Sequence, residues 1–441
     1  MYVSNTPKDR EEMLAAIGVS SFAELVGQVP QQFLNPDIKL HDALNEPELM
    51  ARMEKLGLAN KKLVCFAGGG AYDHFIPSAV RYIASKGEFV TAYTPYQAEA
   101  SQGTLQAIYE YQSSICALFG MDVSNASVYD GATALVEAVG AAMRMTGRKN
   151  VVLPQALHPH YLQTLKTYFS ADEAFRIVTV PCPSGLMDCA AYDAALKDAA
   201  CAVLAVPNYY GCVENPHELA EKAKKAGAVV VALVNPASLG VIAPPGEYGA
   251  DFAVAEGQPL GNPLHYGGPY LGVFTCKKEH VRQVPGRICG ITKDAEGKRA
   301  FVLTLQAREQ HIRREKAASN ICSNEALCAL TATVYLALLG PEGVREVSEL
   351  SLERAHQAAE KLGALPGFSL KFKTPFFNEF VLKCPVPAQK LRDAALAEGV
   401  LAGIPLEGEL KDCLLLSFTE QRTPQDIDLL CSALRKHANA R

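Results

Sequence analysis

The feature that most restricts the fold is a regular alternation of short apolar runs and helical patterns between residues 126 and 256. The apolar runs lack the polar alternation of a half-exposed strand, which is typical of parallel strands covered on both faces. They lie at residues 126–129, 151–153, 176–180, 202–206 and 228–234. The sequence therefore predicts an α/β large domain with a mostly parallel sheet.

The last apolar run, Asp251-Phe-Ala-Val-Ala-Glu256, leads into a loop rich in glycine and proline that ends at Gly268. Open α/β sheets bind ligands at such carboxyl strand ends. In pyridoxal phosphate (PLP) enzymes of the aminotransferase fold (fold type I), this position commonly holds the lysine that forms a Schiff base with the cofactor. Gln258 and Pro259 stand there instead. An amide has no nucleophilic nitrogen, so we expect no covalent cofactor link at Gln258.

A second catalytic group is missing from its expected place. PLP enzymes of this fold use an aspartate after a neighbouring strand to keep the pyridine nitrogen protonated, and this chain has Asn235 after the run 228–234. A neutral amide cannot stabilise a pyridinium as a charge partner. Asn235 and Gln258 together predict that the chain's own cofactor site is decayed.

Three other positions leave two interpretations open. The glycines at 68–70 either cradle an anion or form a tight structural turn. Asp130 and Thr133 either hold a cofactor phosphate at a helix start or only cap that helix. His158 either stacks on a pyridine ring or is an ordinary polar residue at an interface.

A polar loop at residues 93–103 precedes a helical pattern at 105–119. Hydroxyls and amides crowd around a proline that fixes the backbone, which favours a binding loop. The alternative is a capped helix start, with Ser101 or Thr104 near the cap. The candidate substrate-binding residues in this loop are Tyr93, Thr94, Tyr96 and Gln97.

A basic region from Arg282 to Lys316 is expected to be mobile. Its helical segment carries Arg308, Arg313 and Arg314, which either clamp a substrate carboxylate or an acidic partner, or form a solvated helix face.

Three domains are predicted for the 441 residues. Residues 1–60 contain short helices without a core of their own and are expected to wrap the main body or a partner. Residues 61–325 form the large domain. Residues 326–441, beginning with an apolar helix that ends at Gly340-Pro341, form a small α+β domain.

Composition excludes several classes of protein. A net charge of -5 with 20% charged residues does not favour nucleic acid or an anionic membrane as a partner. The 13 cysteines show no zinc-ligand spacing, so no metal is expected and the thiols are predicted to be reduced and mostly buried. No basic, apolar leader begins the chain and no apolar run nears the roughly 20 residues that span a bilayer, so a cytoplasmic location is expected.

Five stretches, in this order along the chain, resemble the P-protein of the glycine cleavage system, glycine decarboxylase. The resemblance is to the N-terminal half of that enzyme in its two-chain form and covers nearly the whole sequence. The stretches lie at residues 68–77, 93–103, 244–251, 257–261 and 308–322.

The resemblance implies a complex of two unlike chains, an α2β2 assembly in which the second subunit carries the PLP lysine. The complex would decarboxylate glycine on PLP at the interface and pass the aminomethyl group to the lipoyl arm of a carrier, the H-protein. Within it, the 93–97 loop is the favoured site for glycine, and Arg308, Arg313 or Arg314 is a weaker candidate. This chain would contribute no catalytic lysine.

Two rival hypotheses remain. The chain is either a free-standing PLP lyase or aminotransferase that uses another lysine, such as Lys277 or Lys278, or a catalytically inert scaffold subunit of a PLP enzyme.

Overall fold

The computed structural model describes residues 4–34 and 36–438, which divide into two compact units, 1–61 and 62–441. The first unit contains three helices: α1 (Pro7–Ile17), α2 (Phe22–Leu25) and α3 (Glu46–Leu58). Thr6 and Asn45 form capping boxes at the starts of α1 and α3. None of its described residues is buried, so this unit has no core of its own.

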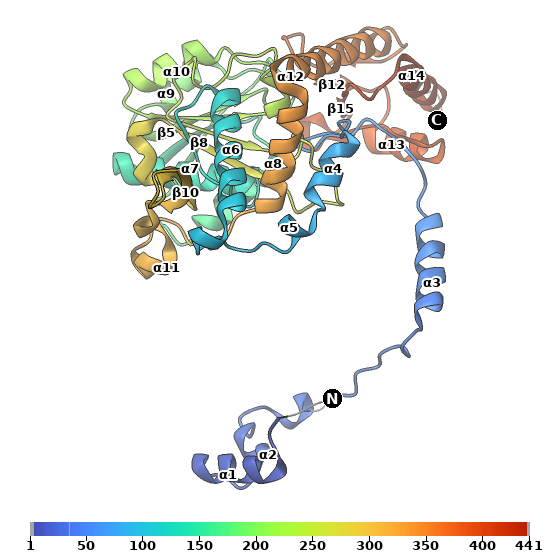
Figure 1. Ribbon diagram of the computed structural model, residues 1–441. Helices are drawn as coiled ribbons and strands as arrows, with labels where there is room; N and C mark the ends of the chain where they lie inside the picture. Colours follow the sequence, from blue (N-terminus) through green and yellow to red (C-terminus); the bar gives the residue numbers. More distant parts are fainter. Residues whose placement is uncertain (1–3, 35, 439–441) are drawn as a thin grey trace. The chain divides into compact units, whose positions relative to one another are not determined.

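The second unit (Figure 1) is built on a seven-stranded sheet in the order β2-β8-β7-β6-β5-β3-β4. Strands β3 to β7 pair in parallel, while β8 is antiparallel to both β7 and β2. The strands are β2 (Val123–Ser124), β3 (Asn150–Pro154), β4 (Arg176–Val180), β5 (Ala199–Val206), β6 (Val229–Val234), β7 (Phe252–Glu256) and β8 (Gly272–Cys276). The predicted α/β fold with a mostly parallel sheet is confirmed.

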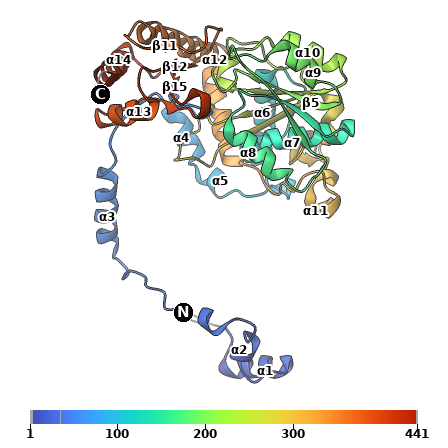
Figure 2. The ribbon, with the colours of Figure 1, turned by 180° about the vertical axis from the view of Figure 1, so that it is seen from behind.

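Helices cover both faces of this sheet. On one face lie α7 (Gly131–Thr146) and α8 (Pro159–Tyr168), as Figure 2 shows. The other face carries α6 (Gln102–Phe119), α9 (Cys189–Ala195), α10 (Pro216–Lys225) and the start of α12 (Ala326–Gly363). Strand β5 is buried on both sides, so its alternate residues join two different cores. Leu204 packs in the core under α6 and α10, and Val203 packs in the core under α7 and α8. The continuous apolar runs of the sequence have this physical cause.

A second, smaller sheet has the order β11-β12-β15-β14 and is antiparallel throughout. Its strands are β11 (Ser369–Leu370), β12 (Glu379–Lys383), β14 (Ile404–Pro405) and β15 (Cys413–Ser417). It packs with the end of α12, α13 (Ala388–Ala397) and α14 (Pro424–Ala438). The predicted C-terminal α+β region is therefore present.

The helix α12 joins the two regions. It bends at Gly340, whose φ of 62° is outside the helical range, and Pro341 follows. Its first half packs on the large sheet and its second half on the small one. By length and composition alone, α12 is also apolar enough to cross a membrane. Its most apolar 18-residue stretch has a mean hydropathy of 1.5, and 28% of that stretch is buried. The sequence-based expectation of no such segment did not anticipate it.

The chain enters the second unit through β1 (Val64–Cys65), which pairs in parallel with β13 (Val400–Leu401) of the C-terminal region. The glycine turn at 68–70 follows at once. A side chain on Gly68 would overlap Glu379 and Ser417, which explains why this turn requires glycine. Short helices α4 (Ser78–Ala84) and α5 (Gly87–Val90) then lead to α6.

The region from Arg282 to Arg299 was expected to be mobile, and this expectation was wrong. It contains β9 (Ile288–Lys293), which pairs antiparallel with β10 (Arg299–Thr304) in a hairpin. Phe301 of β10 and Cys289 of β9 are buried against α6. The short helix α11 (Gln310–Arg313) follows.

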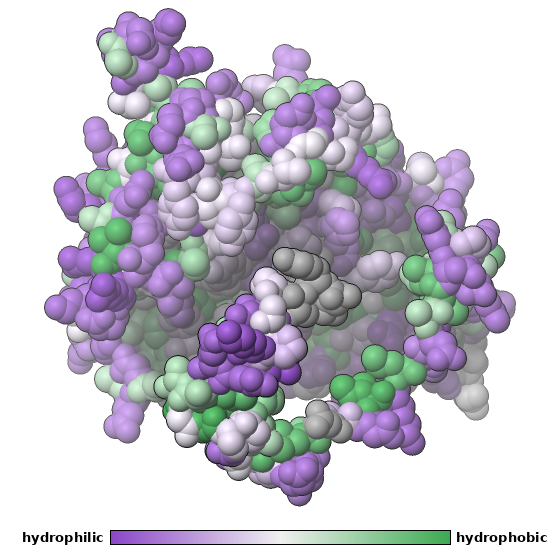
Figure 3. Space-filling model, turned by 60° about the horizontal axis from the view of Figure 1, so that its bottom comes forward, coloured by the Kyte–Doolittle hydropathy of each residue, from purple (hydrophilic) through white to green (hydrophobic). Residues whose placement is uncertain are grey.

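Apolar side chains that reach the surface appear as green patches in Figure 3.

Candidate functional site

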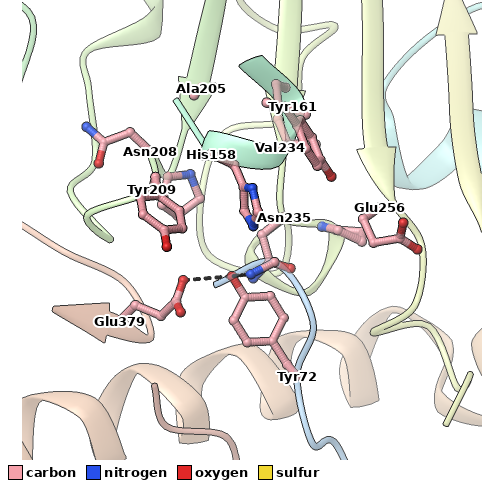
Figure 4. Close-up of a pocket in the computed structure, with 14 residues that line it drawn as sticks. Tyr72, His158, Tyr161, Ala205, Asn208, Tyr209, Val234, Asn235, Glu256 and Glu379 are labelled. Atoms are coloured by element: carbon pink, nitrogen blue, oxygen red, sulfur yellow. Dashed lines mark hydrogen bonds between the residues drawn. The ribbon is translucent and has the colours of Figure 1, made fainter. Parts of the chain in front are cut away.

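A cleft lies at the carboxyl ends of β5, β6 and β7, where the fold places ligands. Strand β12 of the small sheet and the glycine turn close it on the other side. Figure 4 shows the side chains that line it, among them Tyr72, His158, Asn235, Glu256 and Glu379. The cleft therefore combines groups from six separate parts of the chain.

Gln258 is 2% exposed, and its amide is fully engaged. The Oε1 atom accepts a hydrogen bond of 2.8 Å from the Tyr72 main-chain N–H. The Nε2 group donates to the carbonyl oxygens of Tyr72 (3.0 Å) and Asn262 (2.7 Å). Gln258 thus connects the loop after β7 to the segment that follows the glycine turn.

Tyr72 continues this connection to the small sheet. Its hydroxyl donates to Glu379 Oε2 at 2.7 Å, and the N–H of Gly69 donates to Glu379 Oε1 at 2.7 Å. Burial raises the pKa of Glu379 to about 7, against the two hydrogen bonds, which lower it. Burial also raises the pKa of Tyr72 well above its ordinary value, so the phenol remains protonated.

His158 is a neutral imidazole in one tautomer. Its Nδ1 accepts from the N–H of His160 at 3.0 Å, so the proton lies on Nε2, which donates to the Gly69 carbonyl at 2.6 Å. Burial lowers the pKa of His158 to about 4. The structure places His158 in the cleft. Its ring contacts Gly70 of the glycine turn and the ring of Tyr209.

The start of α7 also has an internal partner. Glu256 Oε2 accepts from the N–H of Gly131 at 3.0 Å, and Glu256 Oε1 accepts from the N–H groups of Gln258 (2.9 Å) and Leu271 (3.0 Å). Asp130 Oδ1 accepts from the N–H of Thr133 at 2.7 Å. Thr133 thus takes part in a helix cap, and an acid occupies the helix start where an anion would bind.

These residues do not fit PLP in this chain's own cleft. Gln258 offers no nucleophile, and Glu256 occupies the helix N-terminus that would hold a phosphate. Asn235 uses Oδ1 to accept from the Ala237 N–H at 3.0 Å, and its buried Nδ2 has no partner in the described structure. No cofactor chemistry is therefore derived for this cleft.

The predicted substrate loop lies elsewhere, around the buried guanidinium of Arg287. Arg287 donates to Thr94 Oγ1 (3.1 Å), the Cys322 carbonyl (2.9 Å) and Asn324 Oδ1 (2.9 Å). The guanidinium also lies against the Tyr96 ring, with the Arg287 Cζ atom 5.6 Å from the ring centre. Two stretches that are far apart in sequence, 93–97 and 308–324, are held together in this way.

The remaining loop residues face outward. Tyr93 and Tyr96 are 84% and 53% exposed, and the Tyr96 ring packs edge-on against His311 at 5.8 Å. Gln97 is exposed as well. Within the described residues, neither phenol hydroxyl has a hydrogen-bond partner.

The three predicted arginines do not converge on that loop. Arg308 is committed to main-chain carbonyls, donating to those of Leu305 (3.2 Å), Gly286 (3.0 Å) and Val284. Arg313 lines a basic cavity that it shares with Arg308, and Arg314 is exposed and lies outside that cavity. The other cations of the cavity are Arg144, Arg282 and Lys316.

Sequence reasoning missed Tyr72, Glu256, Arg287 and Glu379 as site residues. Glu256 carried one signal, because a carboxylate that ends a fully apolar strand needs buried partners. Arg287 carried another, since it precedes an apolar strand. One cluster of described residues has metal-ligand spacing, Asp251, Glu279 and His280, but Lys277 Nζ lies 2.6 Å from Asp251 Oδ1 and neutralises it.

The raised pKa of Glu379 predicts a pH-dependent stability. An acid whose pKa is raised by folding stabilises the fold below about pH 4.5 and loses that contribution as the pH rises to about 7. Glu379→Gln keeps an acceptor for Gly69 and a donor for Tyr72, and it stays neutral. Relative to wild type it should gain at most about 3 kcal/mol between about pH 5 and about pH 8. Thermal unfolding across this range measures the difference.

Glu346→Gln, on an exposed part of α12, is the matched control and should follow wild type at every pH. A constant difference between Glu379→Gln and wild type would show that Glu379 does not titrate in the fold.

Arg287→Lys should loosen the 93–97 loop, because an ammonium cannot bind Thr94 and residues 322–324 at once in the planar geometry of a guanidinium. Leaving one buried acceptor unpaired costs about 1–3 kcal/mol. Amide hydrogen exchange at residues 94–97 and 322–324 should therefore quicken by about tenfold or more. Arg282→Lys, an exposed cation nearby in sequence, should leave exchange unchanged, and equal effects of both variants would contradict an anchoring role for Arg287.

Comparison with known proteins agrees with this geometry. A family model described as glycine cleavage system P-protein matches residues 1–434. The probable glycine dehydrogenase (decarboxylating) subunit 1 of Chlorobium chlorochromatii is 51% identical over 98% of each chain. The subunit 1 of Desulfitobacterium hafniense is 48% identical over 98% of this chain and 99% of its own.

Solved structures are also similar to this chain. The crystal structure of a glycine decarboxylase (P-protein) of the glycine cleavage system, in inhibitor-bound form, superposes with a TM-score of 0.87 at 42% identity over 99% of both chains. Glutamate decarboxylase from Lactobacillus brevis, at 14% identity and a TM-score of 0.65 over 96% of this chain and 98% of its own, shares the fold alone. The chain therefore belongs to the glycine cleavage system P-protein family.

Proposed function

We propose that this chain is the lysine-free subunit of a two-chain glycine dehydrogenase (decarboxylating). With a second subunit it decarboxylates glycine on PLP and transfers the aminomethyl group to the lipoyl arm of the H-protein. The second subunit carries the lysine that holds PLP, and the cofactor supplies the electron sink for loss of carbon dioxide. Family membership over nearly the whole chain supports this proposal.

One observation supports the proposal: at Gln258, where the sequence pattern predicts the cofactor lysine, an amide makes three internal hydrogen bonds. A chain of this family without a usable lysine needs the nucleophile of another chain. The relatives bear the name subunit 1, which agrees with a second polypeptide.

This chain contributes binding groups at the shared site. The hydroxyls of Tyr93 and Tyr96 have no partner within the described residues and are free to donate to the glycine carboxylate. Arg287 is buried without a carboxylate partner among those residues, and its charge beside the Tyr96 ring favours an anion at this loop. Two rigid phenols on an anchored loop lose little entropy when they bind.

The N-terminal unit supports an assembly of unlike chains. Its helices expose large apolar side chains, including Met50, Met53 and Leu56 of α3, and bury none. Apolar surface of this kind is stabilised by docking on a partner. We assign that role to the second subunit, in an α2β2 assembly in the cytoplasm, with no nucleic acid or membrane as a partner.

A free-standing PLP enzyme that uses Lys277 is not favoured. Lys277 pairs with Asp251 at 2.6 Å, at the amino end of β7, whereas Gln258 and the cleft lie at the carboxyl end of the same strand. A lysine at the opposite edge of the sheet cannot serve this cleft. Lys278 lies beside it, with its N–H donating to Asp122.

Borohydride reduction tests which chain holds the cofactor. The co-expressed pair, loaded with PLP and reduced, should yield a pyridoxyl-lysine only in the second subunit on peptide mapping. The isolated chain should show no visible Schiff-base absorbance and no glycine/bicarbonate exchange. A stoichiometric label on Lys277 or Lys278, with exchange activity from this chain alone, would replace the proposal with a free-standing enzyme.

The Tyr96→Phe variant of the assembled pair tests the substrate loop. Removing one hydrogen bond to a charged group costs about 1.5–3 kcal/mol, so exchange should slow by about ten- to a hundredfold. Assembly, followed by gel filtration, should not change. Tyr82→Phe, an exposed tyrosine on α4, is the control and should keep full activity. Unchanged turnover in both variants would favour an inert scaffold.

A further inference from the structure

The carboxylate of Glu256 is bound in the way that an external anion would be. Three main-chain N–H groups converge on it, from Gly131 (3.0 Å), Gln258 (2.9 Å) and Leu271 (3.0 Å). The residue is 8% exposed and makes no ion pair among the described residues. Burial raises the pKa of Glu256 to about 7, while the three N–H hydrogen bonds lower it, and one of these N–H groups lies at the N-terminus of the 16-residue helix α7.

The space around this helix start is filled as well. A side chain on Gly131 would overlap the Tyr161 hydroxyl and the main chain of Glu256. The N–H of Thr133 is already taken by Asp130. Two acidic side chains thus face the first turn of α7, and a phosphate placed there would meet both their bulk and their charge.

The neighbouring part of the cleft is occupied by the hydrogen-bonded residues described above. Gln258 fixes the main chain of Tyr72, and Tyr72 binds Glu379 beside the His158 ring. The glycine turn lies against the same histidine. Tyr72, His158 and the glycine turn thus line and narrow the space that remains beside the start of α7.

We propose that this chain closes its own phosphate position with an internal substitute, in which the Glu256 carboxyl group takes the place of a phosphate at the start of α7 while Tyr72 narrows the cleft beside it. The site thus excludes phosphorylated ligands, which is a stronger statement than the absence of a tethering lysine. The inference concerns this cleft only, and it stands whether or not the partner chain carries the catalytic lysine.

Inorganic phosphate is the probe that separates exclusion from a missing tether, because phosphate needs no lysine. Thermal unfolding is compared in phosphate and in chloride at equal ionic strength. Wild type should gain no specific stabilisation. In Glu256→Ala, three N–H groups become free for an anion, and phosphate should bind at least about tenfold more tightly than to wild type. Equal phosphate effects on both proteins would overturn the proposal.

Glu214→Ala is the matched control. Glu214 is also buried, but it accepts one main-chain N–H, that of Met187 at 3.0 Å, and the Asn208 amide at 3.4 Å, instead of three converging main-chain N–H groups. Its removal creates a similar void without an anion site. Phosphate should not stabilise Glu214→Ala, and a gain as large as that of Glu256→Ala would show that any lost carboxylate gives the effect.

Because Glu256→Ala leaves three buried N–H groups without acceptors, it can fail to fold in chloride. Recovery of the fold in phosphate would support the proposal, and failure in both buffers would count against a usable anion position. Wild type supplies an independent measurement with pyridoxamine phosphate, which has the ring and phosphate but no aldehyde for surface lysines to capture. Equilibrium dialysis should detect no saturable binding, and saturable binding that phosphate competes away would refute closure.

Discussion

The structure of the second unit depends on a buried amide at the end of β7. Gln258 accepts one hydrogen bond and donates two, and only a side chain with both functions can bind the N–H and the carbonyl of Tyr72 at once. A lysine ammonium has three donors and no acceptor. Gln258 therefore has a structural role, since it positions Tyr72 and, through Glu379, the small sheet.

Much of the second unit could be predicted from residue patterns because its strands are buried on both faces. The run 176–180 coincides with β4, and 202–206 lies within β5. Local chemistry also sets the start of α7, where capping by Asp130 was one of the two interpretations of Asp130 and Thr133. Short-range rules of this kind need no knowledge of the tertiary structure.

The misses share a physical cause, which is contact between distant residues. Tyr72 meets Glu379 across 307 positions, and Gly131 meets Glu256 across 125. No local pattern encodes such pairs. The hairpin of β9 and β10 was hidden in another way: its charged residues lie at the exposed outer end, Lys293 opposite Arg299, while Cys289 and Phe301 are buried. Counting charges alone made an ordered element resemble a solvated one.

The distribution of satisfied polar groups indicates where this chain acts. In the chain's own cleft, the polar side chains form hydrogen bonds to one another or to the main chain. These side chains are Tyr72, His158, Glu256, Gln258 and Glu379. Around Arg287 the anchor is buried, but the phenols of Tyr93 and Tyr96 point to solvent without partners among the described residues. Unpaired donors on an ordered loop are suited to a ligand or chain that is absent from this polypeptide.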